Sequence, residues 1–116
     1  MISQKIDVAI REVSDFPKPG INFKDITTLL LDTRLSNEIV DAFIERLKEK
    51  QVDAIVGVES RGFLFGFLLA NKMGIPFVPI RKVGKLPAET LKFKYDLEYG
   101  SAEVEVHKSD IKKGWN

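Results

Sequence analysis

Residues 52–80 read VDAIVGVESRGFLFGFLLANKMGIPFVPI, and this stretch decides the fold class. Its first part, Val52–Val58, is a short β-branched run, which is typical of a strand that is buried on both faces. The apolar segment Phe63–Met73 predicts a helix that ends at Gly74, and Ile75–Ile80 predicts a second strand. A strand, a helix and a strand within about 30 residues form a βαβ unit, so the sequence indicates an α/β fold with a parallel sheet.

The residues before this unit predict two helices separated by an extended segment. Isoleucines recur every fourth residue near the N-terminus and Ser3 is a suitable N-cap, so residues 3–13 predict a short helix. Prolines and a glycine in residues 15–20 end that helix, and residues 21–28 are expected to be extended. An apolar stripe through residues 34–50 predicts an amphipathic helix with lysines at its C-terminal end.

The chain after Ile80 is expected to form a loop and then a hairpin. Residues 81–90 have little periodicity and contain turn residues, which indicates a loop. Apolar and charged side chains alternate through residues 91–99 and again through residues 103–107, which predicts two strands. Residues 99–102 are expected to form the hairpin turn between them.

The amino-acid composition of the chain excludes several classes of function. The chain has 116 residues, which is one domain, and 18 Lys and Arg against 17 Asp and Glu give a net charge of +1. This balance argues against a protein that binds nucleic acid or a membrane surface. Cysteine is absent, which excludes disulfide scaffolds, thiol nucleophiles and cysteine-based metal sites. The most apolar run, Phe63–Ala70, is far shorter than the ~20 residues that cross a bilayer, so we expect a cytoplasmic protein.

One candidate anion site lies between the first strand and the helix. Glu59-Ser60-Arg61-Gly62 occupies this turn, where backbone N–H groups and the helix dipole favour a phosphate. Arg61 adds a planar guanidinium suited to phosphate. The alternative is that these side chains cap the helix and face solvent.

The second candidate anion site is a group of basic side chains. Arg81, Lys82 and Lys85 follow the second strand and should emerge at the same edge of the sheet as residues 59–62, where they would suit a polyphosphate. The alternative is a solvated, charged loop.

Other polar and aromatic residues are better explained by structure than by chemistry. Glu98 and Tyr99, at the hairpin end, fit an alternating strand, and His107 fits a structural position in the next strand. The aromatic residues of the predicted helix are expected to lie in the core: Phe63, Phe65 and Phe67.

Four stretches of the sequence occur together, in this order, in one enzyme family. They are residues 15–26 (DFPKPGINFKDI), 59–66 (ESRGFLFG), 80–87 (IRKVGKLP) and 95–100 (YDLEYG). On these stretches the sequence resembles the adenine phosphoribosyltransferases, which are type I phosphoribosyltransferases, and the resemblance runs essentially from end to end.

The resemblance implies a fold and a reaction. The fold is the type I phosphoribosyltransferase fold, a parallel sheet with flanking helices, an N-terminal hood and a β-hairpin flap. Within a single domain, the hood would occupy residues 1–33, the βαβ core residues 34–80, and the flexible flap and hairpin residues 81–107. The reaction would join adenine to 5-phosphoribosyl 1-diphosphate, bound with Mg²⁺, to give AMP and diphosphate in a cytoplasmic homodimer.

The resemblance also implies the residues that bind adenine and move its proton. Asn22 and Lys24 would lie beside the base. The family often has arginine where this chain has Lys24, and lysine keeps the charge but loses the planar stacking surface. Glu98 matches the acid proposed to handle the proton at adenine N7, with Tyr99 next to it.

The resemblance places the pyrophosphate group in the two anion-binding segments. Glu59, Ser60, Arg61 and Gly62 match the family's pyrophosphate loop, which commonly holds a cis peptide bond, here Glu59–Ser60. The flap would add Arg81, Lys82 and Lys85, and in the family Arg81 reaches the site of a neighbouring subunit. None of this chain's side chains is expected to bind the metal directly.

One motif of the family lies beyond Asn116. A strand ending in two acidic residues, and a Thr-Gly-Gly-Thr-type loop that grips the ribose 5′-phosphate, should follow there. We therefore expect the C-terminal part of the fold to be missing, the sheet edge and the helix Phe63–Met73 to be partly exposed, and the chain alone to be inactive. The alternatives are a phosphoribosyltransferase for another base, and a non-catalytic nucleotide-binding or regulatory module.

Overall fold

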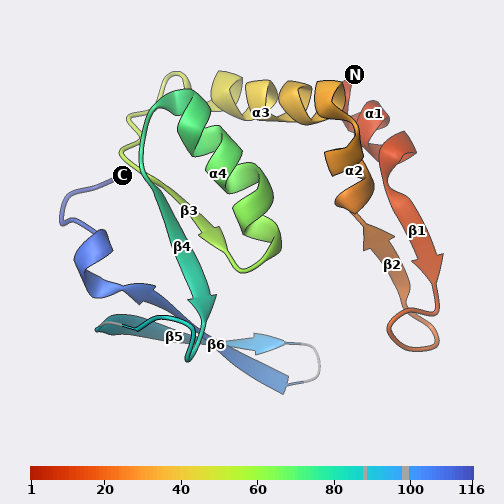
Figure 1. The fold of residues 1–116 in the computed structure, drawn as a ribbon. Helices are drawn as coiled ribbons and strands as arrows, with labels where there is room; N and C mark the ends of the chain where they lie inside the picture. Colours follow the sequence, from red (N-terminus) through yellow and green to blue (C-terminus); the bar gives the residue numbers. More distant parts are fainter. Residues whose placement is uncertain (88, 98–99) are drawn as a thin grey trace. The chain divides into compact units, whose positions relative to one another are not determined.

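A computed structural model gives the structure of residues 1–87, 89–97 and 100–116, which group into two compact units (Figure 1). The first unit is residues 1–45 and the second is residues 46–116. The elements of the first unit are α1 (Ile2–Ala9), β1 (Arg11–Ser14), β2 (Asn22–Asp25), α2 (Thr27–Leu31) and most of α3 (Thr33–Leu47). Those of the second are β3 (Ile55–Val58), α4 (Arg61–Met73), β4 (Phe77–Lys82), β5 (Thr90–Leu97), β6 (Gly100–His107) and the 3₁₀ turn η1 (Lys108–Asp110).

The first unit combines a two-stranded antiparallel sheet with its helices. Strands β1 and β2 pair from Arg11 opposite Asp25 to Ser14 opposite Asn22. Asp15, at φ 57°, begins the connection, and its carboxylate accepts a hydrogen bond from the N–H of Gly20 at 2.8 Å. The buried apolar side chains of this unit come from α2 and α3: Leu29, Leu35, Ile39 and Val40.

The prediction of a helix over residues 3–13 is wrong beyond Ala9. Helix α1 begins after Met1, so Ser3 lies within it and is not its N-cap. Residues 11–14 form β1 because they pair with β2, a contact that local periodicity does not reveal. Residues 27 and 28, expected to be extended, belong to α2, which begins where the Asp25 carboxylate accepts a hydrogen bond from the Thr27 N–H at 2.9 Å.

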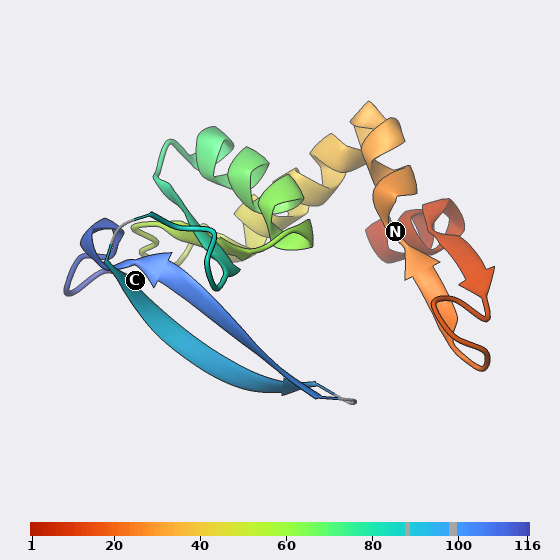
Figure 2. The same cartoon turned by 60° about the horizontal axis from the view of Figure 1, so that its bottom comes forward.

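The second unit is built on a four-stranded mixed sheet in the order β3-β4-β6-β5. Strands β3 and β4 are parallel, as the βαβ prediction requires, and β6 pairs antiparallel with both β4 and β5. Figure 2 shows β5 and β6 as a long hairpin. The hairpin joins β4 through only two residue pairs, Arg81 with Glu105 and Lys82 with Val104. The expected α/β class is confirmed, and the parallel pair continues directly into the hairpin.

Two predicted chain reversals have different outcomes. Gly74 ends α4 in the left-handed conformation at φ 70°, as predicted for a helix-terminating glycine. The hairpin turn predicted over residues 99–102 is wrong at its C-terminal side, because β6 already begins at Gly100, which pairs with Leu97. Cross-strand pairing therefore includes Gly100, Ser101 and Ala102, and residues 98 and 99 lie outside the described part of the chain.

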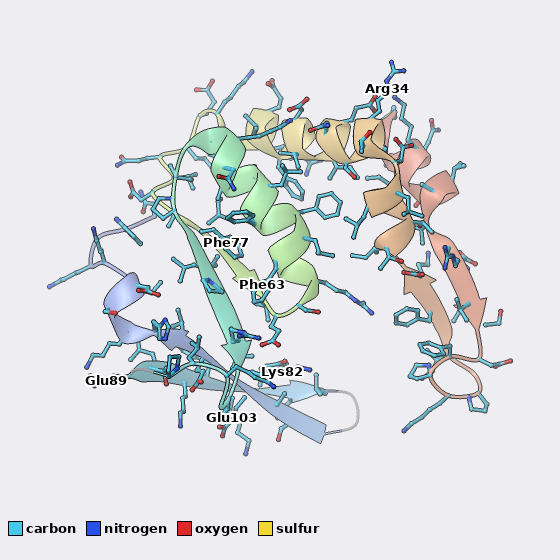
Figure 3. All side chains as sticks on the ribbon, viewed as in Figure 1. Arg34, Phe63, Phe77, Lys82, Glu89 and Glu103 are labelled. Atoms are coloured by element: carbon cyan, nitrogen blue, oxygen red, sulfur yellow. The ribbon has the colours of Figure 1, made fainter. Side chains whose placement is uncertain are left out.

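Helix α4 approaches β3 and β4 closely because glycines line the contact. A Cβ atom on Gly57 would lie 2.5 Å from the carbonyl oxygen of Gly62, and one on Gly66 would lie 2.7 Å from Cε1 of Phe77. Figure 3 shows Phe63 and Phe77 facing each other across this contact, with ring centroids 5.9 Å apart in an edge-to-face arrangement. The absence of side chains on Gly57 and Gly66 makes room for the Phe77 ring between helix and strand.

The expectation that β3 is buried on both faces is wrong. Val56 and Val58 are 51% and 45% exposed, because β3 stands at the end of the sheet order and α4 packs on one face. The predicted burial of the α4 aromatic residues holds only partly: Phe63 and Phe65 are half-buried, whereas Phe67 is 59% exposed. The expected partial exposure of the helix Phe63–Met73 is confirmed, because Leu64 and Phe67 are both exposed. No helix in the described ranges has both the length and the hydropathy of a membrane span.

Candidate functional site

The parallel pairing of β3 and β4 brings the two candidate anion-binding segments together. Val58 lies opposite Ile80, and the N–H of Glu59 donates a hydrogen bond to the carbonyl of Ile80 at 2.8 Å. The chain then turns through a cis peptide bond between Glu59 and Ser60, as the resemblance implies, and α4 begins at Arg61. The carboxyl end of each strand is thus at one sheet edge, where open α/β sheets bind ligands.

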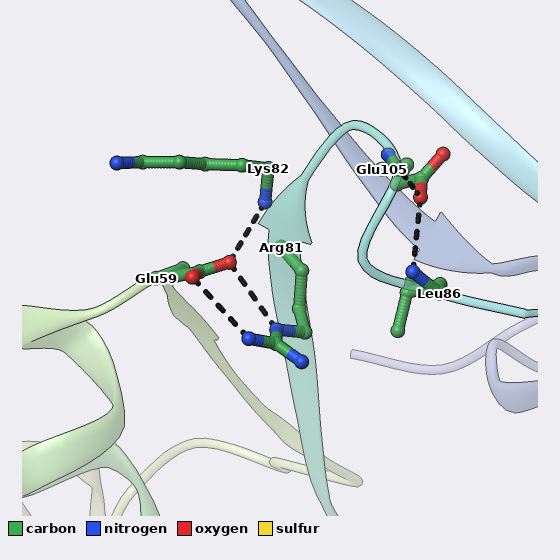
Figure 4. Close-up of polar contacts among 6 residues, drawn as sticks. Glu59, Arg81, Lys82, Leu86 and Glu105 are labelled. Carbon is green, nitrogen blue, oxygen red and sulfur yellow. Dashed lines mark hydrogen bonds and ion pairs between the residues drawn. The ribbon is translucent and has the colours of Figure 1, made fainter.

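Glu59 is tied to the end of β4 by three hydrogen bonds (Figure 4). Arg81 donates from Nε to Oε1 at 3.2 Å and from Nη2 to Oε2 at 3.3 Å. The backbone N–H of Lys82 also donates to Oε1, at 2.9 Å. The Glu59 side chain is 14% exposed and that of Arg81 35%, so the pair is partly shielded from solvent and its guanidinium has a defined orientation.

The electrostatics of this cluster keep Glu59 ionised. The hydrogen bond from the Lys82 N–H, followed by that from the Arg81 guanidinium, holds the pKa of the Glu59 carboxyl below its usual value, although burial opposes the shift. The carboxylate is therefore occupied by Arg81 and Lys82. An anion at this edge would be repelled by the carboxylate, so it would contact the guanidinium and the helix N-terminus instead.

The side chains of Glu59 and Ser60 do not cap α4, which argues against the alternative in which this turn only caps the helix. Ser60 is the N-cap residue, but its hydroxyl makes no capping hydrogen bond, and the Glu59 carboxylate is turned to β4. The first turn of a helix has N–H groups without intrahelical partners and a positive dipole end, which together attract a phosphate. Arg61, an exposed residue, and Gly62 form that first turn.

The other two basic residues at this edge, Lys82 and Lys85, lie at the end of β4 and shortly after it. Lys82 is the last residue of the strand and is exposed. Lys85 is also exposed and lies in a turn, where its N–H donates to the Lys82 carbonyl at 3.3 Å. Gly84, at φ 93°, supplies the left-handed conformation that this turn requires. The sequence prediction that these cations emerge near residues 59–62 is met by the Arg81 side chain, which bonds to Glu59, whereas Lys82 reaches Glu59 through its backbone N–H.

In the first unit, the two residues expected to contact adenine share one partner. Asn22 and Lys24 lie on β2, and both approach Glu12 of β1. The Asn22 amide donates to Oε2 of Glu12 at 3.5 Å, and Nζ of Lys24 lies 3.9 Å from Oε1. Because side chains two apart on a strand share a face, these three polar groups form one exposed patch. Sequence reasoning missed Glu12, since β1 was expected to be helical.

The residues expected to act on the proton, Glu98 and Tyr99, lie outside the described residues. His107, interpreted as structural, has its Nδ1 atom 3.1 Å from Oδ2 of Asp110, a contact between β6 and the following turn. Within the described ranges, no three His, Asp or Glu side chains are arranged to hold a metal ion.

A hollow of about 640 Å³ lies elsewhere, in the first unit. Residues of α1 and the start of α3 line it, among them the ion pair between Lys5 and Glu38, whose charged atoms are 2.9 Å apart. None of the residues expected to bind substrate lines this hollow. Lys5 and Arg34 in its lining both form ion pairs with Glu38, and no residue of the edge at Glu59 lines it.

Comparison with known proteins agrees with the geometry. No family model matches the chain. The adenine phosphoribosyltransferase of Clostridium botulinum (strain Loch Maree) is 58% identical over 105 residues, which are 90% of this chain and 61% of that protein. The chain therefore spans about three fifths of the length of the curated relatives that it matches.

Solved structures give the same result. The adenine phosphoribosyltransferase of Thermoanaerobacter pseudethanolicus is 46% identical, with a TM-score of 0.93 over 99% of this chain and 66% of that one. The Saccharomyces cerevisiae enzyme, solved with adenine and an imino-altritol 1,6-bisphosphate, is 42% identical, with a TM-score of 0.91 over 99% of this chain and 68% of that one. Agreement in sequence and in fold over nearly all of its length shows that the chain belongs to the adenine phosphoribosyltransferase family.

Proposed function

We propose that the protein transfers a phosphoribosyl group from 5-phosphoribosyl 1-diphosphate to adenine, giving AMP and diphosphate. Family membership supports this reaction. The observation that carries the proposal is the edge where β3 and β4 end, because the N-terminus of α4 and the Glu59–Arg81 pair meet there. Backbone N–H groups, a helix dipole and fixed guanidinium groups are the means by which proteins bind a diphosphate.

In this proposal the second unit binds the leaving group. The diphosphate would accept hydrogen bonds from the first turn of α4, at Ser60, Arg61 and Gly62, and from Arg81, which Glu59 orients. Lys82 and Lys85 would add positive charge from the exposed side. As the bond between ribose C1 and the diphosphate oxygen breaks, negative charge builds on the leaving group, and donors already in position stabilise that charge without reorganising.

In this proposal adenine is bound by residues of the first unit, and its proton is moved by Glu98 and Tyr99. Asn22 and Lys24, both linked to Glu12, would hydrogen-bond the base within the hood of residues 1–33. Adenine N9 would then form a bond to ribose C1 as the bond from C1 to the diphosphate oxygen breaks. Glu98, with Tyr99 beside it, would accept the proton that leaves adenine N7. The flap of residues 81–107 would close over the core of residues 34–80 and exclude water, which otherwise hydrolyses the activated ribose.

Magnesium would enter with the substrate. Glu59 is a carboxylate at the proposed diphosphate edge, and both of its oxygens already accept hydrogen bonds. The described residues thus do not fit a metal site held by protein side chains. Mg²⁺ would be bound by oxygens of 5-phosphoribosyl 1-diphosphate and would offset their negative charge, and the roles proposed for the residues do not depend on its position.

The proposal includes a cytoplasmic homodimer in which Arg81 also reaches the neighbouring subunit's site. The family resemblance supports this arrangement. Within this chain the guanidinium is turned to Glu59. In such a dimer, the Arg81 that reaches the neighbouring subunit's site would be oriented by Glu59 of its own chain.

Conversion of radiolabelled adenine tests the function. The assay would use this chain, and this chain extended with the C-terminal segment of the Clostridium botulinum relative, with that relative as the positive control. We expect labelled AMP from the extended protein only when 5-phosphoribosyl 1-diphosphate is present. Hypoxanthine and guanine in place of adenine test the alternative of another base. A folded extended protein that makes no AMP while the relative does would contradict the proposal.

A further inference from the structure

Glu105 is the one charged side chain that is buried among the residues the structure describes, with 3% exposure. It lies on β6, between β4 and β5, opposite Arg81 on one side and Lys92 on the other. Glu103, two residues earlier on the same face of β6, is exposed. Glu105 differs from Glu103 because the turn that contains Gly84 and Leu86 bonds to its carboxylate.

The partners of the Glu105 carboxylate come from this turn and from the first residue of β5. Oε1 accepts hydrogen bonds from the backbone N–H of Gly84 at 3.2 Å and from that of Leu86 at 3.3 Å (Figure 4 draws the latter). Oε2 accepts one from the Thr90 hydroxyl at 3.0 Å. A single carboxylate thus binds the turn after β4 and the start of β5.

These contacts determine the backbone on both sides of Lys85. The flanking amides of Gly84 and Leu86 point to Glu105, while the Lys85 N–H points to the Lys82 carbonyl. The backbone N–H groups of this turn are therefore committed within the protein. An anion beside the turn can be contacted by the side chain of Lys85, an exposed residue, but not by these amides.

Glu105 is charged when it holds the turn. Burial by itself would raise the pKa of its carboxyl. The hydrogen bonds from Thr90, Leu86 and Gly84, and the positive charge of Lys92, together outweigh burial and hold this pKa below its usual value. Charged acceptors form stronger hydrogen bonds than neutral ones, so removal of the charge should loosen the turn.

We infer that Glu105 is a positioning residue that fixes the Gly84–Leu86 turn and thereby presents Lys85 to the diphosphate group. The inference rests on the proposed function for the identity of the anion. It assigns Glu105 no contact with substrate. Its effect on binding must therefore pass through Lys85.

Amide hydrogen exchange tests the first half of the inference on this chain, without any ligand. In Glu105→Ala, exchange at Gly84 and Leu86 should accelerate by about tenfold or more, because each amide loses a charged acceptor. Glu105→Gln keeps the shape and one acceptor oxygen, and should give intermediate rates even where the alanine variant does not fold. Glu103→Ala is the matched control and should leave both amides unchanged. Wild-type rates at Gly84 and Leu86 in both Glu105 variants would overturn the inference.

Calorimetry with inorganic pyrophosphate tests the second half. Glu105→Ala should weaken binding on the order of fivefold, and Lys85→Ala by a similar factor. The double variant should bind no more weakly than Lys85→Ala alone, because the two residues act in series. Additive losses would overturn the link to Lys85. Faster exchange in Glu105→Ala without any pyrophosphate binding by the wild type would support the holding of the turn and contradict the proposed diphosphate site.

Discussion

Arg81 donates two hydrogen bonds to the carboxylate of Glu59, from Nε at 3.2 Å and from Nη2 at 3.3 Å. Glu59 directly follows β3 and Arg81 is the next-to-last residue of β4, so the pair links the turn before α4 to the start of the flap. A guanidinium held on one edge by a carboxylate is pre-oriented and loses less side-chain freedom when it meets an anion. This pair accounts for the geometry of the proposed diphosphate site.

The Glu59–Arg81 pair should make the free energy of unfolding depend on pH in the acid range. Because the folded state lowers the pKa of Glu59, the pair's contribution is complete above the unfolded pKa of about 4.3 and is lost as the pH falls through the lower folded value. Urea unfolding of the wild type and of Glu59→Gln, followed from pH 7 to pH 3, measures this. The difference in unfolding free energy should be constant near neutrality and shrink below about pH 4. Glu49→Gln, at an exposed position after α3, is the control, and an equal pH dependence in that variant would refute the assignment.

Arg61 should contribute to anion affinity through both its charge and its planar shape. We expect Arg61→Ala to weaken binding of inorganic pyrophosphate by about tenfold or more, and Arg61→Lys to give a smaller loss because it keeps the charge without the fork of donors. Isothermal titration calorimetry at fixed ionic strength provides the measurement. Exposed Lys50, at the end of the α3 region, offers a control charge whose loss should change little. Unchanged affinity in Arg61→Ala would remove Arg61 from the site.

Gly66 should be needed for the close packing of α4 on β4. An alanine in a helix is ordinarily more stable than glycine by roughly 0.5–1 kcal/mol. Here its Cβ would lie 2.7 Å from Cε1 of Phe77, and overpacking of this kind costs about 1–3 kcal/mol. We therefore expect Gly66→Ala to lower the unfolding free energy in chemical denaturation. Adding Phe77→Leu should recover part of the loss, and a stabilised single variant would show that the contact is not tight.

Local sequence patterns predicted the elements whose causes are local. The βαβ unit followed from a β-branched run and an apolar segment, and Gly74 ended α4 as its position indicated. Alternation predicted the hairpin strands. The cis peptide bond at Glu59–Ser60 was available only from the family resemblance, since no spacing rule implies it.

The features that sequence missed depend on contacts between distant residues. Strand β1 exists because it pairs with β2, and four residues carry too little periodicity to show it. Glu105 stands in an alternating Glu-Val-Glu pattern that indicates an exposed face, but it is buried and bonds to Gly84, Leu86 and Thr90, contacts that the pattern does not reveal. Val56 and Val58 have the residue type of a fully buried strand, but their strand lies at the end of the sheet order.

The proposed function requires the edge formed by residues 59–62 and Arg81 to bind a diphosphate. The most direct measurement is a titration of the isotope-labelled chain with inorganic pyrophosphate, followed by the NMR shifts of backbone amides and arginine side chains. We predict saturable shifts that are largest at Ser60, Arg61 and Gly62, together with Nε of Arg81. Shifts absent from residues 60–62, or confined to residues 1–45, would contradict this prediction.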